Sequence, residues 1–295
     1  MIAWRAVRVG FVTPLLWQRF GPPWAALIAD IGADAVQPAA DEIVQALDDP
    51  RVAAVSALAP RIAVASAVAC GNVDLLVVPQ LLAPRDGGRG SAQDPWVADL
   101  PAMIARTLSG GPGVVPVPVE RGPHVDNAVM PALMRINRDA GVVRRAWERR
   151  RRELETPWRG PVTRATPAPG EGPRVALVGE PWWFTPATIP MLRQGAGRLV
   201  GQFQLDPEDV RAEGRRVRDD LVDPDAEVIG AARRFARQSA VDVVRLVLDR
   251  ESGTAPWLER RVREVATRAL EVVWVTDVAD AETWARALTP PVGRG

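Results

Sequence analysis

Short apolar runs alternate along the chain with longer amphipathic segments. The first run covers residues 7–12, and an amphipathic segment opened by Pro22 and Pro23 and closed by Gly32 separates it from a second run at residues 34–38. This order predicts a β-α-β unit, in which a crossover helix joins two parallel strands. The turn after the first strand then lies at the sheet edge where parallel sheets bind their ligands.

The same order returns in the second half of the chain. Residues 174–179 predict a strand, residues 180–186 a turn, residues 187–194 a helix and residues 198–203 a second strand. The runs that begin at Arg8 and Arg174 occupy the same position in two copies of one design. The pattern therefore predicts an α/β protein of two Rossmann-like lobes, each with a mostly parallel sheet covered by helices on both faces and related as an internal structural repeat.

The pattern of apolar and polar residues in the rest of the chain predicts the other strands and helices of both lobes. Pro116 and Pro118 push one strand towards a sheet edge, because proline has no N–H for a ladder. We expect further strands at residues 74–80, 114–119, 241–249 and 270–276, and helices at residues 41–47, 60–71, 100–108, 125–154, 223–238, 256–267 and 280–288, with another opened by Pro207. Gly141 is the expected weak point of the helix over residues 125–154.

A segment rich in Pro, Gly and Thr at residues 156–173 has almost no apolar periodicity and predicts a linker. The expected organisation is an N-terminal lobe over residues 1–155 and a C-terminal lobe over residues 174–295. A chain of 295 residues is long enough for two such cores. A connector of this kind also permits the lobes to hinge around a cleft.

Composition excludes much catalytic chemistry. Every basic residue other than His124 is an arginine, and the absence of lysine excludes a Schiff base and a phosphate-loop lysine. His124 is the only histidine, so at most one imidazole could serve a triad or a zinc site, and its Gly-Pro-His context indicates an exposed turn. Cys70 is the only cysteine, which excludes an intrachain disulfide, and we expect it to be a small buried core residue.

Charge and hydropathy limit the partners. The chain has 37 arginines and 36 acidic residues, and the arginine-rich residues 144–152 are interrupted by Glu148, so we expect a solvated or salt-bridged face and no nucleic-acid partner. No apolar run approaches the ~18–20 residues of a membrane span, so we expect no membrane partner. The N-terminus lacks the features of a signal peptide, and we expect a soluble, cytoplasmic protein.

Polar residues after the predicted strands supply the candidate site. Residues 13–19, 80–94, 180–183 and 249–254 together with Asp277 are expected around one inter-lobe cleft. No GxGxxG fingerprint or phosphate loop follows either leading strand, so nucleotide binding is not expected. The candidate ligand-binding residues are Thr13, Trp17, Arg19, Asp94, Glu180, Trp182 and Thr254.

Each candidate has two interpretations. Trp17 and Arg19 offer an aromatic surface and a guanidinium for an anionic or flat ligand, although tryptophans also serve as core residues. Two of the carboxylates near strand ends could provide an acid–base pair, and each could instead cap a helix or bind an arginine: Glu180, Asp249, Glu251 and Asp277. The linear order leaves the catalytic residues undetermined.

The first third of the chain resembles the region shared by 2-hydroxyacyl-CoA dehydratases, benzoyl-CoA reductase subunits and the extended acyl-CoA dehydratase activases. The resemblance rests on Val-Gly-Phe-Val-Thr-Pro-Leu-Leu-Trp-Gln-Arg-Phe-Gly-Pro-Pro-Trp at residues 9–24, Ile-Gly-Ala-Asp-Ala-Val at residues 31–36 and Asp-Leu-Leu-Val-Val-Pro-Gln at residues 74–80. Leu-Pro-Ala-Met-Ile at residues 100–104 is similar to the family's Leu-Pro-Asp-Met motif. Residues 178–181 and 253–256 match more loosely.

The resemblance implies a [4Fe–4S] cluster held between the lobes by three cysteines. The matching positions here are Leu58 in Ala-Leu-Ala-Pro, Asp94 in Asp-Pro and Thr254 in Gly-Thr-Ala-Pro, so all three thiolates are missing. Thiolates hold such clusters, and leucine cannot coordinate iron. We therefore expect no cofactor, no metal site and no cluster-dependent dehydration or ring reduction.

Two function classes remain open. The first is a cluster-free, non-catalytic homologue of 2-hydroxyacyl-CoA dehydratase-type proteins that binds a small anionic ligand or a partner subunit through the inter-lobe cleft. A second copy of the chain, or a cysteine-bearing subunit that supplies a cluster, belongs to the same class. The alternative is an enzyme with non-redox chemistry on an acyl-CoA-like substrate that uses Asp94 or Glu180.

Overall fold

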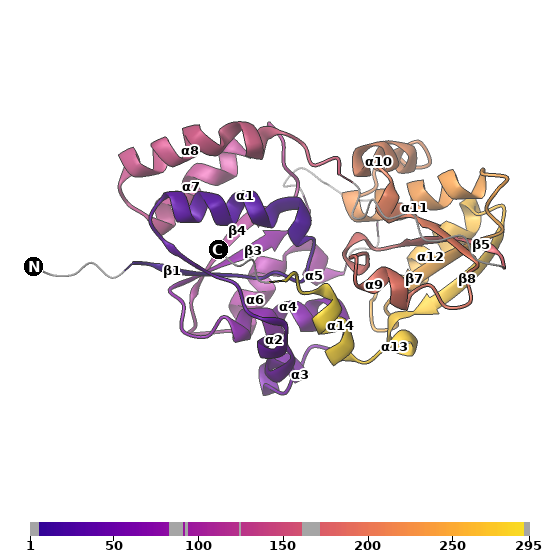
Figure 1. Ribbon diagram of the computed structural model, residues 1–295, viewed down its shortest axis with the longest axis horizontal. Helices are drawn as coiled ribbons and strands as arrows, with labels where there is room; N and C mark the ends of the chain where they lie inside the picture. The colour runs from indigo at the N-terminus through magenta and orange to yellow at the C-terminus, as the bar shows by residue number, and fades with distance from the viewer. Residues whose placement is uncertain (1–5, 83–90, 92–93, 124, 161–171, 292–295) are drawn as a thin grey trace, which may run out of the picture. The chain divides into compact units, whose positions relative to one another are not determined.

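The computed structural model describes residues 6–82, 91, 94–123, 125–160 and 172–291. His124, most of the loop before Asp94 and most of the expected linker lie outside the described residues. The chain divides into two compact units (Figure 1), one built mainly from the first half of the sequence and one from the second. Each unit is an α/β domain with its own parallel sheet.

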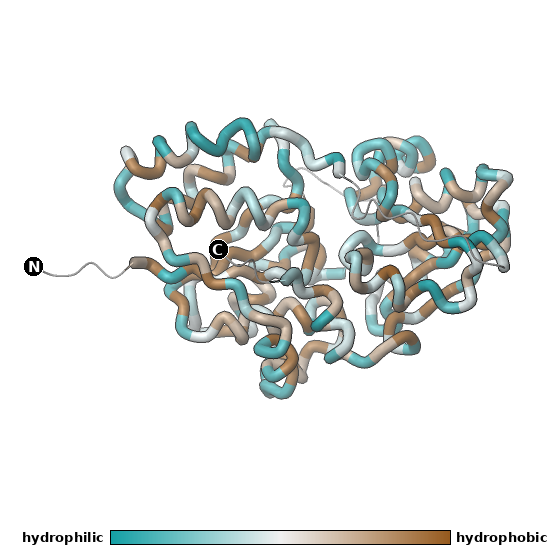
Figure 2. Tube along the Cα trace, in the orientation of Figure 1, coloured by the Kyte–Doolittle hydropathy of each residue, from teal (hydrophilic) through white to brown (hydrophobic). Residues whose placement is uncertain are grey.

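The sheet of the N-terminal unit has four parallel strands in the order β2-β1-β3-β4. Strand β4 lies at an edge, which confirms the prediction from Pro116 and Pro118. Alternate residues of the buried strands face the helices on each side, and Figure 2 shows hydrophobic colour along them. The strands are β1 (Arg8–Phe11), β2 (Asp34–Val36), β3 (Leu75–Gln80) and β4 (Gly113–Pro118).

Helices cover both faces of this sheet (Figure 1). On one face lie α1 (Trp17–Asp30), α7 (Asp126–Ile136) and α8 (Ala140–Glu155), and most residues along α8 are hydrophilic (Figure 2). Glu148 and Glu155 each pair with an arginine four residues earlier on α8, so the helix has the expected salt-bridged face. On the other face lie α2 (Ala40–Ala46), α3 (Pro50–Ala53), α4 (Leu58–Ala69), α5 (Pro95–Ala98) and α6 (Leu100–Thr107).

The C-terminal unit repeats this topology with the strand order β6-β5-β7-β8, again all parallel. One face of its sheet packs on α10 (Pro207–Arg215), α11 (Asp223–Ala236) and α12 (Ala255–Val265) through a core of Val, Leu, Ala and Phe side chains. The other elements are β5 (Arg174–Gly179), η1 (Pro181–Trp183), α9 (Thr188–Met191), β6 (Arg198–Gly201), η2 (Gln202–Gln204), β7 (Val243–Leu248), β8 (Ala269–Trp274), α13 (Val275–Val278) and α14 (Ala281–Leu288).

A matching hydrogen-bonded corner supports the internal repeat. The backbone N–H of Arg8 donates to Oδ2 of Asp74 at 2.7 Å, and the backbone N–H of Arg174 donates to Oδ2 of Asp242 at 2.8 Å. In return, the N–H of each aspartate donates to the carbonyl of its arginine, at 2.9 and 3.0 Å. The two lobes therefore share their strand order and the reciprocal arginine–aspartate hydrogen bonds that join the first strand of each sheet to the third.

Two glycines allow α10 and α11 to pack with their backbones almost touching. A Cβ at Gly230 would lie 2.0 Å from the carbonyl oxygen of Val210, and a Cβ at Gly214 would lie 2.1 Å from that of Ala226. Both obstacles are backbone atoms of the facing helix, which cannot rotate away. This crossing requires glycine at both positions.

The predicted start of the first helix is wrong. Helix α1 begins at Trp17, so Pro22 and Pro23 lie inside it, and the expected polar turn ends at Leu16, which adopts a left-handed backbone with φ of 57°. The indole of Trp17 lies over Gly21, where a Cβ would be 2.1 Å from the ring. Packing of Trp17 on its own helix thus extends α1 beyond the prolines, which local propensity did not predict.

The predicted long helix over residues 125–154 is two helices. The break lies at residues 137–139, between α7 and α8, and Gly141 belongs to the first turn of α8. Asp139 caps that turn, because its Oδ1 accepts hydrogen bonds from the backbone N–H groups of Gly141 and Val142. The cap at Asp139, and not the glycine, marks the interruption.

The compact units differ from the expected domain boundaries in two segments. The main changeover lies between Trp158 and Arg159, within the expected linker, but the described residues Leu82, Ser91 and Asp94 group with the C-terminal unit and residues 289–291 with the N-terminal unit. Within the described residues of the first segment, Oγ of Ser91 accepts a hydrogen bond from Val222 N–H, and Asp94 bonds to Thr254. Contacts far apart in sequence decide this grouping. In the described part of the chain, no helix has both the length and the hydropathy needed to cross a bilayer.

Candidate functional site

Four carboxylate side chains come together in the C-terminal unit, and we call them the acidic group: Asp94, Glu180, Asp225 and Asp249. Glu180 directly follows β5 and Asp249 directly follows β7, two strands that pair in parallel, so both residues lie at the carboxyl edge of the sheet. The charges of the other three all raise the pKa of Glu180, which places them within electrostatic reach of it. This is the edge at which parallel α/β sheets bind ligands.

Glu180 is a deeply buried member of the acidic group. Its side chain belongs to a residue only 4% exposed, and the indole Nε1–H of Trp183 donates to its Oε2 at 3.1 Å. Burial raises the pKa of Glu180 to about 8, although the Trp183 hydrogen bond acts in the opposite direction, and the neighbouring acidic charges raise it further. Glu180 is therefore mainly a neutral carboxylic acid at pH 7, able to donate a hydrogen bond.

Asp225 lies in the first turn of α11 and is also buried. Burial raises its pKa to about 7, a hydrogen bond with Ser91 lowers it, and the charge of Asp94 raises it. In the described part of the chain, Oδ2 of Asp225 has no hydrogen-bond partner. Asp225 thus has one carboxyl oxygen unsatisfied in a buried environment.

Asp94 is held in place by the turn that opens α12. The hydroxyl of Ser252 donates to Oδ2 of Asp94 at 2.7 Å, and the backbone N–H of Asp94 donates to Oγ1 of Thr254 at 3.2 Å. Gly253 lets Asp94 approach, because a Cβ there would be 2.6 Å from its Oδ1. The carboxyl group is therefore fixed relative to the ends of β7 and α12.

Gln202 adds an amide next to the same edge. Its Oε1 accepts a hydrogen bond at 3.3 Å from the backbone N–H of Gly179, the residue before Glu180. Its Nε2 is buried and has no partner among the described residues. One end of the amide is thus fixed by the scaffold, while the other retains a free donor.

The internal repeat shows that the fold does not require these acids. Counting from Arg8 and Arg174, Glu180 corresponds to Pro14; counting from Asp74 and Asp242, Asp249 corresponds to Leu81. Both corresponding residues of the N-terminal unit are buried, and one is apolar leucine. A sheet of the same topology folds without carboxylates at these positions, so their cost in the C-terminal unit calls for another explanation.

The candidates predicted from sequence separate between the two units. Asp94, Glu180 and Thr254 come together in the C-terminal unit, and Trp182 is buried in η1 beside Glu180. Thr13, Trp17 and Arg19 belong to the N-terminal unit. The expected cleft between lobes stays a prediction.

Two of the N-terminal candidates, Thr13 and Trp17, are packed against other side chains of the fold. Thr13 is fully buried, and its backbone N–H contacts Oγ of Ser66 at 3.4 Å. Trp17 packs edge-on against Phe11 and Phe20, with ring centroids 5.4 and 5.6 Å away. The packing interpretation of Trp17, left open by the sequence, accounts for these contacts.

Arg19 has the geometry expected of an anion contact, but a carboxylate of the chain already occupies it. Its Nη1 lies 3.0 Å from Oε1 of Glu120, and its guanidinium carbon lies 5.4 Å from the centroid of the Trp158 ring. The Arg19 side chain is 6% exposed and that of Glu120 27% exposed. A bound anion would have to displace Glu120.

Sequence reasoning missed Asp225 and Gln202, and it included Ser252 only within the expected range 249–254, without a role of its own. Asp225 follows Asp-Pro at a helix start, a context that indicates helix capping and gives no signal of a site. Asp277, which the sequence places among the carboxylates at the strand ends, instead pairs with Arg250 on the surface at 3.0 Å.

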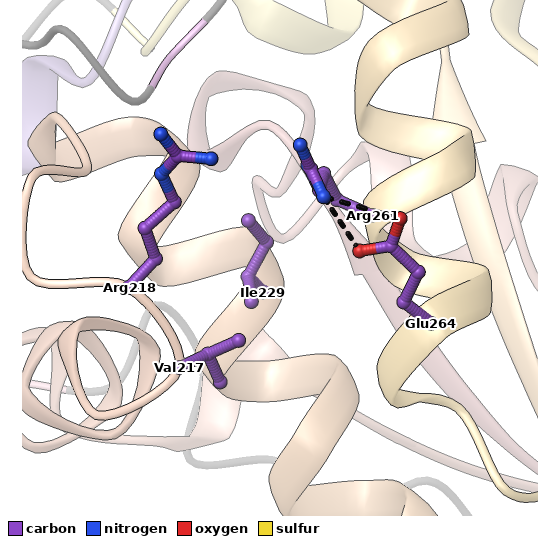
Figure 3. A pocket seen from close by; sticks show the side chains of 5 residues that line it. All are labelled: Val217, Arg218, Ile229, Arg261 and Glu264. Atoms are coloured by element: carbon purple, nitrogen blue, oxygen red, sulfur yellow. Dashed lines mark hydrogen bonds and ion pairs between the residues drawn. The ribbon is translucent and has the colours of Figure 1, made fainter.

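Away from the acidic group, the C-terminal unit has a concavity between α11, α12 and the segment that follows α10 (Figure 3). It has a volume of about 320 Å³ and is lined by Val217, Arg218, Ile229, Arg261 and Glu264. Arg261 binds Glu264 at 2.8 Å, and Arg218 binds the nearby Asp220 at 2.7 Å. Both guanidiniums already have a carboxylate, so this hollow has no excess positive charge for an anion.

The donor set does not fit the iron–sulfur cluster that the family resemblance implies. Asp94 and Thr254, at two of the expected thiolate positions, are hydrogen-bonded to each other, and Leu58 has no donor atom. Cys70 is buried, as predicted, and burial raises the pKa of its thiol to about 12, which disfavours the thiolate. Among the described residues, no three His, Cys, Asp or Glu side chains have the arrangement of a metal site.

Comparisons with known proteins add little to this geometry. No protein-family model and no curated protein matches the chain. Among solved structures, a GTP-binding protein from the hyperthermophilic archaeon Sulfolobus solfataricus, crystallised with GDP, is 12% identical, with 96% of this chain and 97% of that chain covered and a TM-score of 0.21. A likeness at this level carries no argument about function. The established description is an α/β protein with two Rossmann-like lobes.

Proposed function

We propose that the acidic group performs non-redox acid–base chemistry on an acyl-CoA-like substrate, with Glu180 as the acid. The observation that carries the proposal is the gathering of Asp94, Glu180 and Asp225 from three distant segments at the carboxyl edge of one sheet. Burial keeps Glu180 protonated near neutral pH. Acid–base catalysis needs a proton donor and a proton acceptor within one site.

The roles follow from the surroundings of each carboxyl group. Neutral Glu180 would donate its proton in a hydrogen bond to the carbonyl oxygen of the acyl group, which stabilises negative charge that develops there. Asp94, fixed by the hydroxyl of Ser252, is the candidate base for a proton next to that carbonyl. The acyl-CoA class itself comes from the family resemblance.

Exchange of substrate protons with solvent tests this function. Butyryl-CoA and 3-hydroxybutyryl-CoA, incubated with the protein in D₂O, should lose the NMR signal of the protons next to the thioester. Glu180→Gln and Asp94→Asn should each slow this exchange by roughly 10²–10⁴-fold, the usual contribution of one acid or base.

Asp277→Asn is the matched control, because it removes a carboxylate from the same unit that is paired with Arg250 on the surface. Its exchange rate should equal that of the unaltered protein. Absence of exchange for both thioesters, or exchange that persists in Glu180→Gln, would exclude the proposed reaction.

A second candidate function is the binding of a small anion by a non-catalytic, cluster-free homologue of 2-hydroxyacyl-CoA dehydratase-type proteins. The observation that favours it is the buried guanidinium of Arg19 between Glu120 and the Trp158 ring. A guanidinium against an aromatic ring suits a planar carboxylate or a phosphate. A partner subunit or a second copy of the chain remains an alternative occupant.

Removal of the internal competitor should reveal such a site. In Glu120→Gln, Arg19 loses its carboxylate, so the affinity for acetyl-CoA should rise about fivefold, corresponding to roughly 1 kcal/mol for a charge-assisted contact. Arg19→Gln should abolish binding. Isothermal titration calorimetry measures both, with Asp34→Asn as control because Asp34 belongs to an exposed ion pair of the same unit. Equal affinities in all four proteins would rule out Arg19 as the anion site.

A further inference from the structure

Within the described residues, no cation balances the charge of buried Asp225. The groups that shift the pKa of Asp225 besides burial are Ser91 and Asp94, and neither is cationic. Glu180 likewise has a tryptophan N–H and three acids as its neighbours. A buried carboxylate without a cation is costly, and proteins usually pair such a group.

The arginines of the neighbouring helix α10 form ion pairs with carboxylates other than Asp225. Arg211 of α10 contacts Asp223 and Glu227, which lie on either side of Asp225 along α11. Arg215 also binds Asp223. The sequence thus places three acids in the first five residues of α11, two of which have arginine partners within the unit.

The buried polar atoms without a hydrogen-bond partner at this edge indicate which groups a ligand must contain. Oδ2 of Asp225 is an unsatisfied acceptor on a residue only 6% exposed, and its neighbour Asp94 adds negative potential. Nε2 of Gln202, buried next to the end of β5, is an unsatisfied donor. A cationic donor therefore complements Asp225, and an oxygen acceptor complements Gln202.

The scaffold does not need an acid at the start of this helix. Helix α4 precedes β3 as α11 precedes β7, and α4 begins with the apolar residues Ala57 and Leu58. Asp225 is therefore an addition to the shared design, as Glu180 and Asp249 are. An ammonium group would satisfy its open oxygen and balance its charge.

We propose that Asp225 binds the ammonium group of a substrate that also carries a carbonyl, so that the ligand of the acidic group is an aminoacyl compound. The inference rests on the site proposed above but not on turnover there. Ionised Asp225 holds the cation, Gln202 donates to a ligand oxygen, and Glu180 remains the neutral acid. Asp225 is then the specificity-determining residue.

Three isosteric probes of different charge test this inference without catalysis. Propylammonium, propanol and propionate have the same chain length, and titration calorimetry compares their affinities for the full-length protein. Propylammonium should bind at least tenfold more tightly than either of the other two. Asp225→Asn should remove that preference, while Asp277→Asn, the exposed control, should retain it.

Circular dichroism should show whether Asp225→Asn is folded, and Gln202→Leu provides a second variant that leaves the charge unchanged. Gln202→Leu should retain the preference for propylammonium and weaken glycinamide, which carries both groups, by about tenfold relative to propylammonium. Equal affinity for propanol and propylammonium, or a preference that survives Asp225→Asn, would overturn the inference. Loss of proton exchange with an intact ammonium preference would instead remove only the proposed acid–base function.

Discussion

Glu180→Gln should stabilise the protein at pH 8 by an amount on the order of a few kcal/mol, and should change its stability little at acid pH. Glutamine has nearly the shape of the neutral glutamic acid and keeps an oxygen for the Trp183 Nε1–H. It removes only the ionisation that burial penalises. Each unit of pKa shift corresponds to about 1.4 kcal/mol between the two protonation states.

The sign follows from the direction of the shift. The pKa of Glu180 rises from 4.5 to about 8 on folding, so the unfolded chain releases this proton at lower pH than the folded protein. The stability contributed by the neutral form is fully present below pH 4.5 and is lost as pH rises towards 8. Asp225 adds a slope of the same sign between its ordinary pKa of 3.8 and about 7.

Urea unfolding of the two proteins between pH 4.5 and pH 8.5 measures this effect. Unaltered protein should lose stability with rising pH more steeply than Glu180→Gln. Glu251→Gln, an exposed substitution a few residues after β7, should follow the unaltered protein. Parallel curves for all three proteins would show that Glu180 is not a buried acid with a raised pKa.

Gly230→Ala should destabilise the C-terminal unit by about 3 kcal/mol or more. The new methyl group would lie 2.0 Å from the carbonyl oxygen of Val210, and α10 and α11 would have to move apart. Overpacking of a close-packed interior commonly costs about 1–3 kcal/mol, and the obstacle here is backbone. The better helix propensity of alanine, worth up to about 1 kcal/mol, is too small to compensate.

Thermal and urea unfolding followed by circular dichroism measure this loss. Gly141→Ala is the matched control, because it makes the same change in a helix where the nearest atoms are the ends of the Asp139 and Arg145 side chains, at 3.2 and 3.3 Å. The control should be neutral or slightly stabilising. Equal stability of the two variants would contradict the close crossing of α10 and α11.

Local patterns were sufficient for much of the fold. Continuous apolar runs predicted the parallel strands, because a strand buried on both faces has no polar side to mark. The prolines of β4 predicted its edge position, since each lacks a ladder donor. The recurrence at Arg8 and Arg174 predicted the repeat that the shared strand order confirms.

Local patterns failed where a contact within or between elements outweighed propensity. Two consecutive prolines indicate a helix start, but packing of Trp17 on Gly21 accompanies an extra turn before them. Gly141 suggested a break that lies instead at the Asp139 cap. In both places one side-chain interaction determined a boundary that composition alone did not indicate.

The same distinction between local pattern and long-range contact applies to the candidate site. The sequence by itself determined two parallel α/β lobes and placed Glu180 and Asp249 after neighbouring strands, because strand order and chain direction fix which residues reach the carboxyl edge. Only the tertiary structure added Asp225, Gln202 and the Asp94–Ser252 contact, because these depend on segments 23 to 158 residues apart that meet through folding. It also decided the protonation of Glu180, since burial, which shifts its pKa, is a property of the whole fold.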